Sequence, residues 1–147
     1  MKPLFEIAAF GSFESMRDAL KNLNTRQIDT IVSHGGYTLA GEASGYGNLD
    51  TLNALADRGV DLNACDRDLG GEPPIHCAIV QNHVEVIRYL LHKKVDLKSL
   101  GWMGRTGLEM LIKDGRFRNL VHSESADGYH LEKQNCRLIV ESANDEL

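Results

Sequence analysis

The sequence predicts an all-α repeat solenoid, a fold in which pairs of helices stack side by side within one domain. Three observations predict this fold class. A segment recurs after 33 to 35 residues, and the apolar residues inside each copy have helical spacing. The chain has 147 residues, of which 42% are hydrophobic and 25% are charged, as expected for a single globular domain. We therefore treat residues 1–147 as one domain.

The repeat is clearest at the end of each copy. Gly59–Asn63 (GVDLN) recurs 35 residues later as Lys94–Lys98 (KVDLK). In a third copy, Thr106 lies 33 residues after Pro73. The basic period is therefore 33 residues, with two residues inserted once. The turn-forming residues of Asp66–Pro74 (DRDLGGEPP) place this insertion in an enlarged turn.

Each copy contains an amphipathic helix. The apolar residues of Val84–Leu91 follow one face of a helix, and those of Leu49–Ala56 repeat that face one period earlier. Gly59 follows the earlier helix, and we expect it to adopt the left-handed conformation that glycine accepts without strain. Lys94 holds the equivalent place. We therefore expect a weak point at Lys94.

Both ends of such a stack need a cap, because each unit turns an apolar face toward its neighbour. Near the N-terminus, Ser12–Ser15 can cap a helix that continues through Met16 and Leu20. We expect this region to be a divergent capping repeat. The apolar residues of His130–Ala143 are expected to close the other end.

The middle copy resembles a known family. Pro73–Ala78 (PPIHCA) resembles the Thr-Pro-Leu-His-x-Ala signature of the ankyrin repeat, and the VDLN and VDLK segments resemble the Ala-Asp-Val-Asn that ends such a repeat. The resemblance extends from Tyr37 to Arg118, although the copies around Thr38 and Thr106 lack both the proline and the histidine. It implies about four stacked helix-turn-helix units, caps included, with β-turn or hairpin tips.

The repeat pattern divides the chain into four parts. We expect the N-terminal capping repeat at 1–36, a repeat at 37–69, a repeat with the enlarged turn at 70–104, and a degenerate repeat with a C-terminal capping helix at 105–147.

The charge of the chain restricts its partners. There are 16 Lys and Arg residues against 21 Asp and Glu, a net charge of −5. Residues 1–73 hold 6 basic and 11 acidic side chains, whereas residues 74–118 hold 8 and 4. Overall acidity argues against nucleic-acid binding, which needs a basic face, and it suits a basic protein partner. No apolar run reaches the roughly 18 residues of a membrane span, so we expect no membrane association.

The cysteines and the N-terminus predict a cytoplasmic protein. Cys65, Cys77 and Cys136 form no C-x-x-C unit and cannot all pair with one another, which favours a reducing compartment. Glu6 interrupts the apolar stretch that a secretory signal requires.

The residues that could carry chemistry are few. Cys65, Asp66, His76 and Cys77 are the most metal-like set, since thiolates and imidazoles bind zinc, but they lack the close pairs typical of zinc sites. The family resemblance instead implies that His76 hydrogen-bonds the backbone between neighbouring repeats and that Cys77 is a core residue of an inner helix. No calcium-loop spacing or glycine-rich phosphate motif is present. We therefore expect no enzymatic activity, no metal and no cofactor.

A stack of helix pairs offers a concave face, formed by its inner helices and turn tips, as a binding surface. Trp102, the single tryptophan, lies between two glycines in a turn, and Trp and Arg are frequent among binding hot spots. The alternative is that Trp102 folds back and packs against the next turn. By resemblance to the family, the predicted partner-binding residues are Tyr46, Arg67, Asp68, Glu72, Gln81, Trp102, Met103, Arg105, Lys113 and Asp114.

The leading hypothesis is a non-enzymatic protein–protein interaction module that acts as a monomer rather than as a homo-oligomer. A narrower version is an inhibitor or immunity protein for a basic toxin or nuclease, whose basic face an acidic chain could block. One alternative is a scaffolding or self-assembling repeat protein. A third reading is a zinc-dependent activity at Cys65, His76 and Cys77.

Overall fold

The computed structural model describes residues 3–101 and 104–113 of the chain. This part of the chain folds into helices joined by turns and contains no extended strand. The helices are α1 (Leu4–Phe10), α2 (Phe13–Leu20), α3 (Thr25–Asp29), α4 (Leu39–Gly45), α5 (Leu49–Asp57), α6 (Pro74–Val80), α7 (Val84–His92) and α8 (Gly107–Lys113). The predicted all-α repeat solenoid is confirmed.

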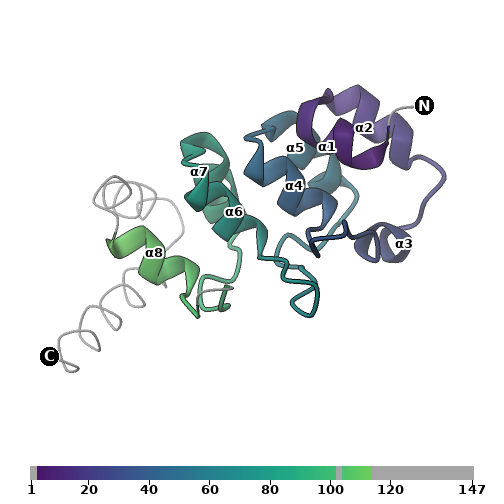
Figure 1. Cartoon of the computed structure of the whole chain (residues 1–147). Helices are drawn as coiled ribbons and strands as arrows, with labels where there is room; N and C mark the ends of the chain where they lie inside the picture. The colour runs from purple at the N-terminus through teal and green to yellow at the C-terminus, as the bar shows by residue number, and fades with distance from the viewer. Residues whose placement is uncertain (1–2, 102–103, 114–147) are drawn as a thin grey trace, which may run out of the picture.

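The helices are arranged as stacked pairs (Figure 1). Helices α1 and α2 form one pair, α4 and α5 the next, and α6 and α7 the third, while α8 follows α6 in the row of inner helices. Helix α4 packs between α1 and α6, and α5 packs against α2. The short α3 lies in the segment between the first two pairs. The predicted C-terminal capping helix falls outside the described residues.

Backbone conformations recur with the period seen in the sequence. Gly59 and Lys94, 35 residues apart, both have a positive φ, of 72° and 57° respectively. Gly47 and Asn82 form a second such pair, with φ of 72° and 58°. The predicted left-handed conformation at Gly59 is confirmed, and the lysine at the equivalent position adopts it as well. A side chain other than glycine is strained in this conformation, which gives the predicted weak point at Lys94 a physical basis.

The segments before α4 and α8 each contain one antiparallel bridge. Isolated antiparallel bridges join Val32 to Thr38 and Leu100 to Thr106. Thr38 and Thr106 then cap α4 and α8, with each hydroxyl oxygen accepting a hydrogen bond from a main-chain N–H three residues later. Pro73, at the equivalent place before α6, offers no side-chain cap. The middle repeat therefore starts its inner helix with the rigid proline pair instead.

The predicted helix start near the N-terminus is confirmed. Ser12 caps α2, and Ser12 and Ser15 form a reciprocal capping box, in which each hydroxyl oxygen accepts from the other residue's main-chain N–H at 3.1 and 2.8 Å. Met16 and Leu20 of this helix are fully buried. Helices α1 and α2 therefore contribute to the core like the later pairs, while the boundaries given above for the four units stay predictions.

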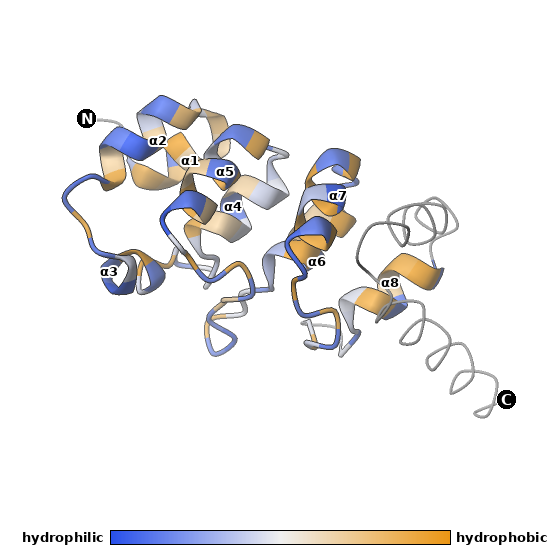
Figure 2. Cartoon of the chain, turned by 180° about the vertical axis from the view of Figure 1, so that it is seen from behind, coloured by the Kyte–Doolittle hydropathy of each residue, from blue (hydrophilic) through white to orange (hydrophobic). Residues whose placement is uncertain are grey.

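The core runs along the stack between the two rows of helices. Each helix carries both hydrophobic and hydrophilic residues (Figure 2), and the hydrophobic ones bury themselves against the neighbouring helices. The largest fully buried side chains are Met16, Leu20, Ile28, Leu39, Leu52, Leu55, Ile75, Ile87, Leu90, Leu91 and Leu108. None of the helices in the described ranges has the length and apolar character that a membrane crossing requires.

Candidate functional site

The inner helices present an exposed apolar ridge, which consists of Phe10, Tyr46 and Val80. These side chains are 72%, 53% and 61% exposed, so they contribute little to the core. Phe10 and Val80 are the last residues of α1 and α6, and Gly45 ends α4 at the same place. Because Gly45 has no side chain, Tyr46 occupies this position on the ridge. Its ring meets Phe10 edge to face, with the centroids 4.9 Å apart and the planes at 71°.

A cleft of about 470 Å³ lies beside this ridge, between α4 and α6. Its volume is within the range of small-molecule and side-chain pockets. Two carboxylates, two tyrosine rings and apolar side chains line the cleft, together with two polar residues of the turn before α7. The lining residues are Tyr37, Gly41, Glu42, Gly45, Tyr46, Glu72, Cys77, Val80, Gln81 and His83.

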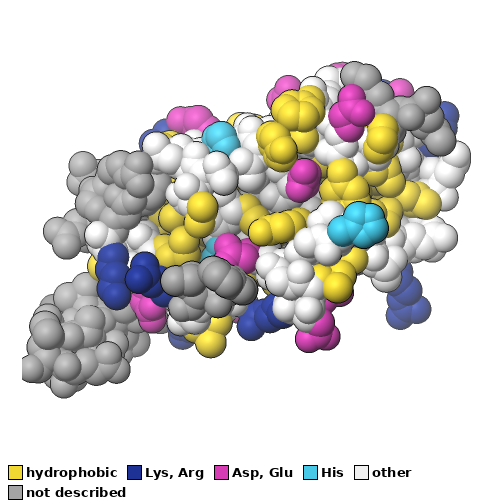
Figure 3. Space-filling view, in the orientation of Figure 1, with side chains coloured by type: hydrophobic (Ala, Val, Ile, Leu, Met, Phe, Trp, Pro, Cys, Tyr) yellow, Lys and Arg dark blue, Asp and Glu magenta, His cyan; other side chains and the backbone are white. Residues whose placement is uncertain are grey.

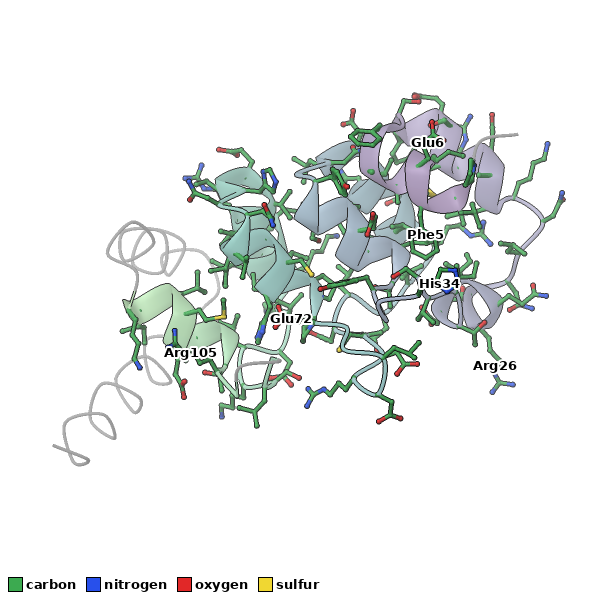
Figure 4. All side chains as sticks on the ribbon, viewed as in Figure 1. Phe5, Glu6, Arg26, His34, Glu72 and Arg105 are labelled. Carbon is green, nitrogen blue, oxygen red and sulfur yellow. The ribbon has the colours of Figure 1, made fainter. Side chains whose placement is uncertain are left out.

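The face around the cleft combines acidic and apolar side chains. In the space-filling view, hydrophobic and acidic side chains lie next to one another over the inner helices, and Lys and Arg side chains lie toward the edges of this face and at its α8 end (Figure 3). Glu72 is placed in the middle of the stack, where the chain enters α6, whereas Arg105 lies at the α8 end (Figure 4). Acidic side chains therefore lie over the part of the face that contains the cleft, among other places.

Burial changes the acid–base properties of the lining. Burial raises the pKa of the Glu42 carboxyl, because partial removal from water disfavours its charged form. Burial also raises the pKa of the Tyr37 hydroxyl, and the nearby groups of Cys77, Glu72 and Glu42 raise it further. Glu42 and Glu72, which both line the cleft, therefore both raise the pKa of the Tyr37 hydroxyl.

His83 fixes one wall of the cleft. Its Nε2 lies 2.9 Å from the main-chain oxygen of Gly45. A carbonyl oxygen can only accept a hydrogen bond, so Nε2 carries the proton in this contact. The bond connects the turn before α7 to the end of α4, across the boundary between two repeats. It therefore holds the C-terminal ends of α4 and α6 at a fixed separation.

The enlarged turn forms a separate surface. Asp66 organises it, since its carboxylate accepts hydrogen bonds from the main-chain N–H groups of Asp68 and Leu69 at 3.1 and 3.3 Å. Arg67 extends from this turn to the next one, where its guanidinium donates to the Ser99 hydroxyl at 2.6 Å. Arg67 and Asp68 line a second hollow of about 550 Å³, apart from the α4–α6 cleft.

The zinc reading finds no support in the described residues, among which no three His, Cys, Asp or Glu side chains are placed to hold a metal ion. Cys77 is buried in α6, and burial raises the pKa of its thiol to about 12, which disfavours the thiolate that binds zinc. His76 is also buried, and burial lowers the pKa of its imidazole, while hydrogen bonding to the backbone of Ser99 in the next repeat acts in the opposite direction. The role that the family resemblance implied for His76 matches this contact.

The structure brings together only some of the predicted partner-binding residues. Tyr46, Glu72 and Gln81 line the α4–α6 cleft, whereas Arg67 and Asp68 lie at the enlarged turn. Arg105 and Lys113 are exposed at the two ends of α8, outside both hollows. Trp102, Met103 and Asp114 lie outside the described residues. The arrangement therefore leaves their role in binding a prediction.

Sequence reasoning missed several residues of this face, among them Phe10, Tyr37 and Glu42. Phe10 lies 35 residues before Gly45, so the repeat period carried through the divergent first unit would have identified it. Tyr37 holds the place of Glu72 one period earlier, and Glu42 holds that of Cys77. Glu42 gave no recognisable signal, because a glutamate on a helix usually lies in solvent.

The fold and this face define a class, that of helical repeat proteins with an exposed apolar surface on the inner helices. Comparison with known families agrees, because residues 37–91 match the family described as ankyrin repeats. This segment of the chain therefore consists of ankyrin repeats. The matched segment contains the two helix pairs that form the cleft, except for the last residue of α7.

Similar curated proteins are much longer than this chain. It is 29% identical over 121 residues to protein phosphatase 1 regulatory subunit 12A of Rattus norvegicus, a match that covers 76% of this chain and 12% of that protein. It is 32% identical over 81 residues to the BCL-6 corepressor-like protein 1 of Homo sapiens, covering 55% of this chain and 4% of that protein.

A bacterial relative is closer in size. The chain is 31% identical over 85 residues to a putative ankyrin repeat protein of Rickettsia bellii, a match that covers 56% of this chain and 46% of that protein. The chain thus matches less than half the length of each of these relatives.

Proposed function

We propose that this chain is a non-enzymatic protein–protein interaction module that binds a protein partner through its concave face. The observation that carries the proposal is the exposed ridge of Phe10, Tyr46 and Val80 beside an acidic cleft. Large apolar side chains that are more than half exposed and lie in one row are typical of interaction surfaces. The names of two relatives, a regulatory subunit and a corepressor-like protein, fit such a role.

The proposed surface extends from the ridge to the turn tips. It includes the ridge itself and the residues predicted from the sequence, which are Tyr46, Arg67, Asp68, Glu72, Gln81, Trp102, Met103, Arg105, Lys113 and Asp114. Tyr46 and Glu72 form its centre, since both line the cleft. Arg and Trp in the turns supply the side chains that most often dominate binding energy.

The narrower proposal is that the partner is basic and that the chain inhibits it. The net charge of −5 and the two carboxylates in the cleft favour a basic surface, such as the phosphate-binding face of a nuclease or toxin. We place this encounter in the cytoplasm, with the chain acting as a monomer. Electrostatic steering then makes the association rate fall as salt is added.

Capture from an extract of the source cells tests the interaction. The bait is the full chain, and the test variant combines Phe10→Ser, Tyr46→Ser and Val80→Ser. The control variant combines Asn53→Ser and Arg88→Ser, which change exposed residues of the outer helices α5 and α7. Circular dichroism of all three chains checks that they are folded.

We expect the native chain and the control to recover one partner in comparable amounts and the ridge variant to recover at least about tenfold less, the loss expected for hot-spot residues. Recovery of the same partner by all three chains would refute the proposed surface, and recovery of none would refute the interaction. Light scattering of the free chain at micromolar concentration tests the monomer, because a stable oligomer would point to self-assembly instead.

A further inference from the structure

The α4–α6 cleft is lined by groups that attract a cation. Of its ten lining residues, two are glutamates and two are tyrosines, and none is lysine or arginine. The remaining basic group, the imidazole of His83, is hydrogen-bonded to Gly45 at the wall. The cleft thus combines negative charge with aromatic faces, both of which stabilise a positively charged guest.

Glu42 carries an uncompensated charge in this cleft. Its carboxylate makes no hydrogen bond and no ion pair with any residue in the part of the chain that the structure describes. Partial burial has already removed some of its water, as its raised pKa indicates. Folding has therefore already removed part of the water that an ion pair with Glu42 would displace. A cation that binds Glu42 in the cleft consequently gains more binding free energy than it would at an open surface.

The shape and chemistry of the lining favour a guanidinium over an ammonium group. A guanidinium is planar and weakly hydrated, it stacks on aromatic rings, and its five N–H groups can serve two carboxylates at once. Glu42, in the first turn of α4, and Glu72, just before α6, both line the cleft, and both raise the pKa of the Tyr37 hydroxyl. An ammonium is a compact, strongly hydrated charge that leaves much of a cleft of about 470 Å³ unfilled.

We propose that the α4–α6 cleft receives an arginine side chain of the partner protein, with its guanidinium between Glu42 and Glu72 and an apolar neighbour of that arginine on the ridge of Phe10, Tyr46 and Val80. This inference rests on the proposed function and names the chemistry that the concave face recognises. It commits to an arginine next to an apolar residue in the bound segment. Charge complementarity and the adjacent ridge carry the argument.

Three capped tripeptides test this inference on the uniformly ¹⁵N-labelled full chain. They are acetyl-Leu-Arg-Leu-amide, the same peptide with lysine at the centre, and the same peptide with citrulline, whose neutral side chain has the shape of arginine. Each is titrated while amide chemical shifts are followed. The expected result is saturable shifts at residues of the cleft and the ridge, with the arginine peptide binding at least about tenfold tighter than the citrulline peptide.

The lysine peptide is expected to bind with intermediate affinity. Equal affinity of the arginine and citrulline peptides would overturn the inference, as would an absence of binding, shifts confined to residues outside the cleft, or tighter binding of the lysine peptide. These comparisons use the native chain, so they stand even if a variant fails to fold.

Two charge-matched variants localise the effect. Glu42→Gln with Glu72→Gln removes both cleft carboxylates, and Glu14→Gln with Asp50→Asn removes two exposed carboxylates of the outer helices α2 and α5. The cleft variant should lose at least about tenfold in affinity for the arginine peptide and little for the citrulline peptide. The control variant should bind both peptides as the native chain does. An equal loss in the two variants would show a general charge effect and would overturn the inference.

The inference and the proposed function fail in different ways. If the native chain captures a partner, and the ridge variant loses it while the cleft variant retains it in full, the interaction module stands and the arginine pocket is refuted. If no partner is captured by the native chain, the proposed function itself is refuted, whatever the tripeptides do.

Discussion

The imidazole Nε2 of His83 lies 2.9 Å from the main-chain oxygen of Gly45 and connects two successive repeats. One period earlier, Asn48 makes the same kind of connection, since its side-chain amide donates to the main-chain oxygen of Gly11 at 2.9 Å. The backbone at the two positions is nearly identical, with φ and ψ of −88° and 83° at His83 and −86° and 87° at Asn48. The two side chains therefore have the same role, which is to link neighbouring repeats through a hydrogen bond to the end of an inner helix.

The equivalence of these positions predicts the effect of replacing His83. Asn48 also caps α5, because its side-chain oxygen accepts from the Thr51 N–H at 3.3 Å, whereas His83 gives α7 no cap. His83→Asn should therefore preserve the link and add a cap, for a gain of up to about 1 kcal/mol in the free energy of unfolding. His83→Ala should lose about 1 kcal/mol with the hydrogen bond. Guanidinium denaturation measures both, and an asparagine variant no more stable than the alanine variant would contradict the equivalence.

Arg58 stabilises the stack at the level of the outer helices. Its guanidinium donates to the main-chain oxygens of Leu20, at 2.8 Å, and of Leu23, at and just after the C-terminal end of α2, where the helix dipole favours a cation. Arg58→Ala should lower the free energy of unfolding by about 2 kcal/mol, because two charge-assisted bonds are lost. Arg58→Lys should recover only part of the lost stability, since an ammonium cannot donate two hydrogen bonds with the fixed geometry of a guanidinium.

The control for Arg58 is Arg17→Ala on α2. Arg17 is exposed and lies 3.7 Å from Asp18, so its loss should change stability by no more than about 0.5 kcal/mol. Urea denaturation compares the three variants with the native chain. A cost at Arg17 equal to that at Arg58 would show that the carbonyl contacts contribute little.

The sequence predicted the repeat architecture because its signals are local and periodic. The left-handed residue at Gly59 and the capping box at Ser12 each follow from a few neighbouring residues, and the structure confirms both. The cleft could be predicted only in part, because it combines residues of two repeats. Tyr46 and Glu72 were recognised because they hold family positions. Glu42 lines the cleft, and Phe10 joins the ridge, only because α1, α4 and α6 lie side by side. Spacing along the chain does not reveal how deeply such a carboxylate is buried.

The left-handed positions offer a direct measure of backbone strain. A Cβ atom added at Gly59 would meet no atom within 4 Å, so Gly59→Ala tests the conformation alone. With φ at 72°, the variant should lose about 1 to 2 kcal/mol in the free energy of unfolding. Lys94→Gly, where φ is 57°, should gain less than about 1 kcal/mol, because glycine relieves the strain but loses more conformational entropy on folding. Thermal denaturation checks both, and opposite signs at the two positions are the required result.

The buried thiol of Cys77 should be unreactive in the folded chain. Burial raises its pKa to about 12, so at pH 8 only roughly one thiol in 10⁴ is ionised, and thiolate is the reactive form. Cys65 is partly exposed. In a Cys136→Ser background, Ellman's reagent at pH 8 should label one thiol quickly and the second only after unfolding in guanidinium. Rapid labelling of two thiols in the native state would contradict this burial and would reopen a chemical role for Cys77.

The charge on Glu42 should make stability depend on pH in a predictable direction. Because burial raises its pKa above the ordinary 4.5, the folded chain holds a proton on this carboxyl more strongly than the unfolded chain does. The slope of stability with pH follows the difference in bound protons, so the contribution of Glu42 falls as pH rises from 4.5 through the raised value. At pH 7 the ionised carboxylate lowers the free energy of unfolding, and a neutral side chain at this position does not have that effect.

Glu42→Gln should therefore be more stable than the native chain at pH 7, by up to about 0.5 kcal/mol for a partly exposed group, and the difference should shrink toward pH 4. Glu14→Gln, at an exposed position on α2, is the control and should show no such gain at pH 7. Denaturant titrations across this pH range measure the three chains. If Glu42→Gln were less stable than the native chain at pH 7, the carboxylate would already have a partner in the free protein. Glu42 would then not be available to bind a cation of the partner. A gain in stability at pH 7 combined with a loss of arginine-peptide affinity would identify Glu42 as a residue whose charge costs stability and serves binding.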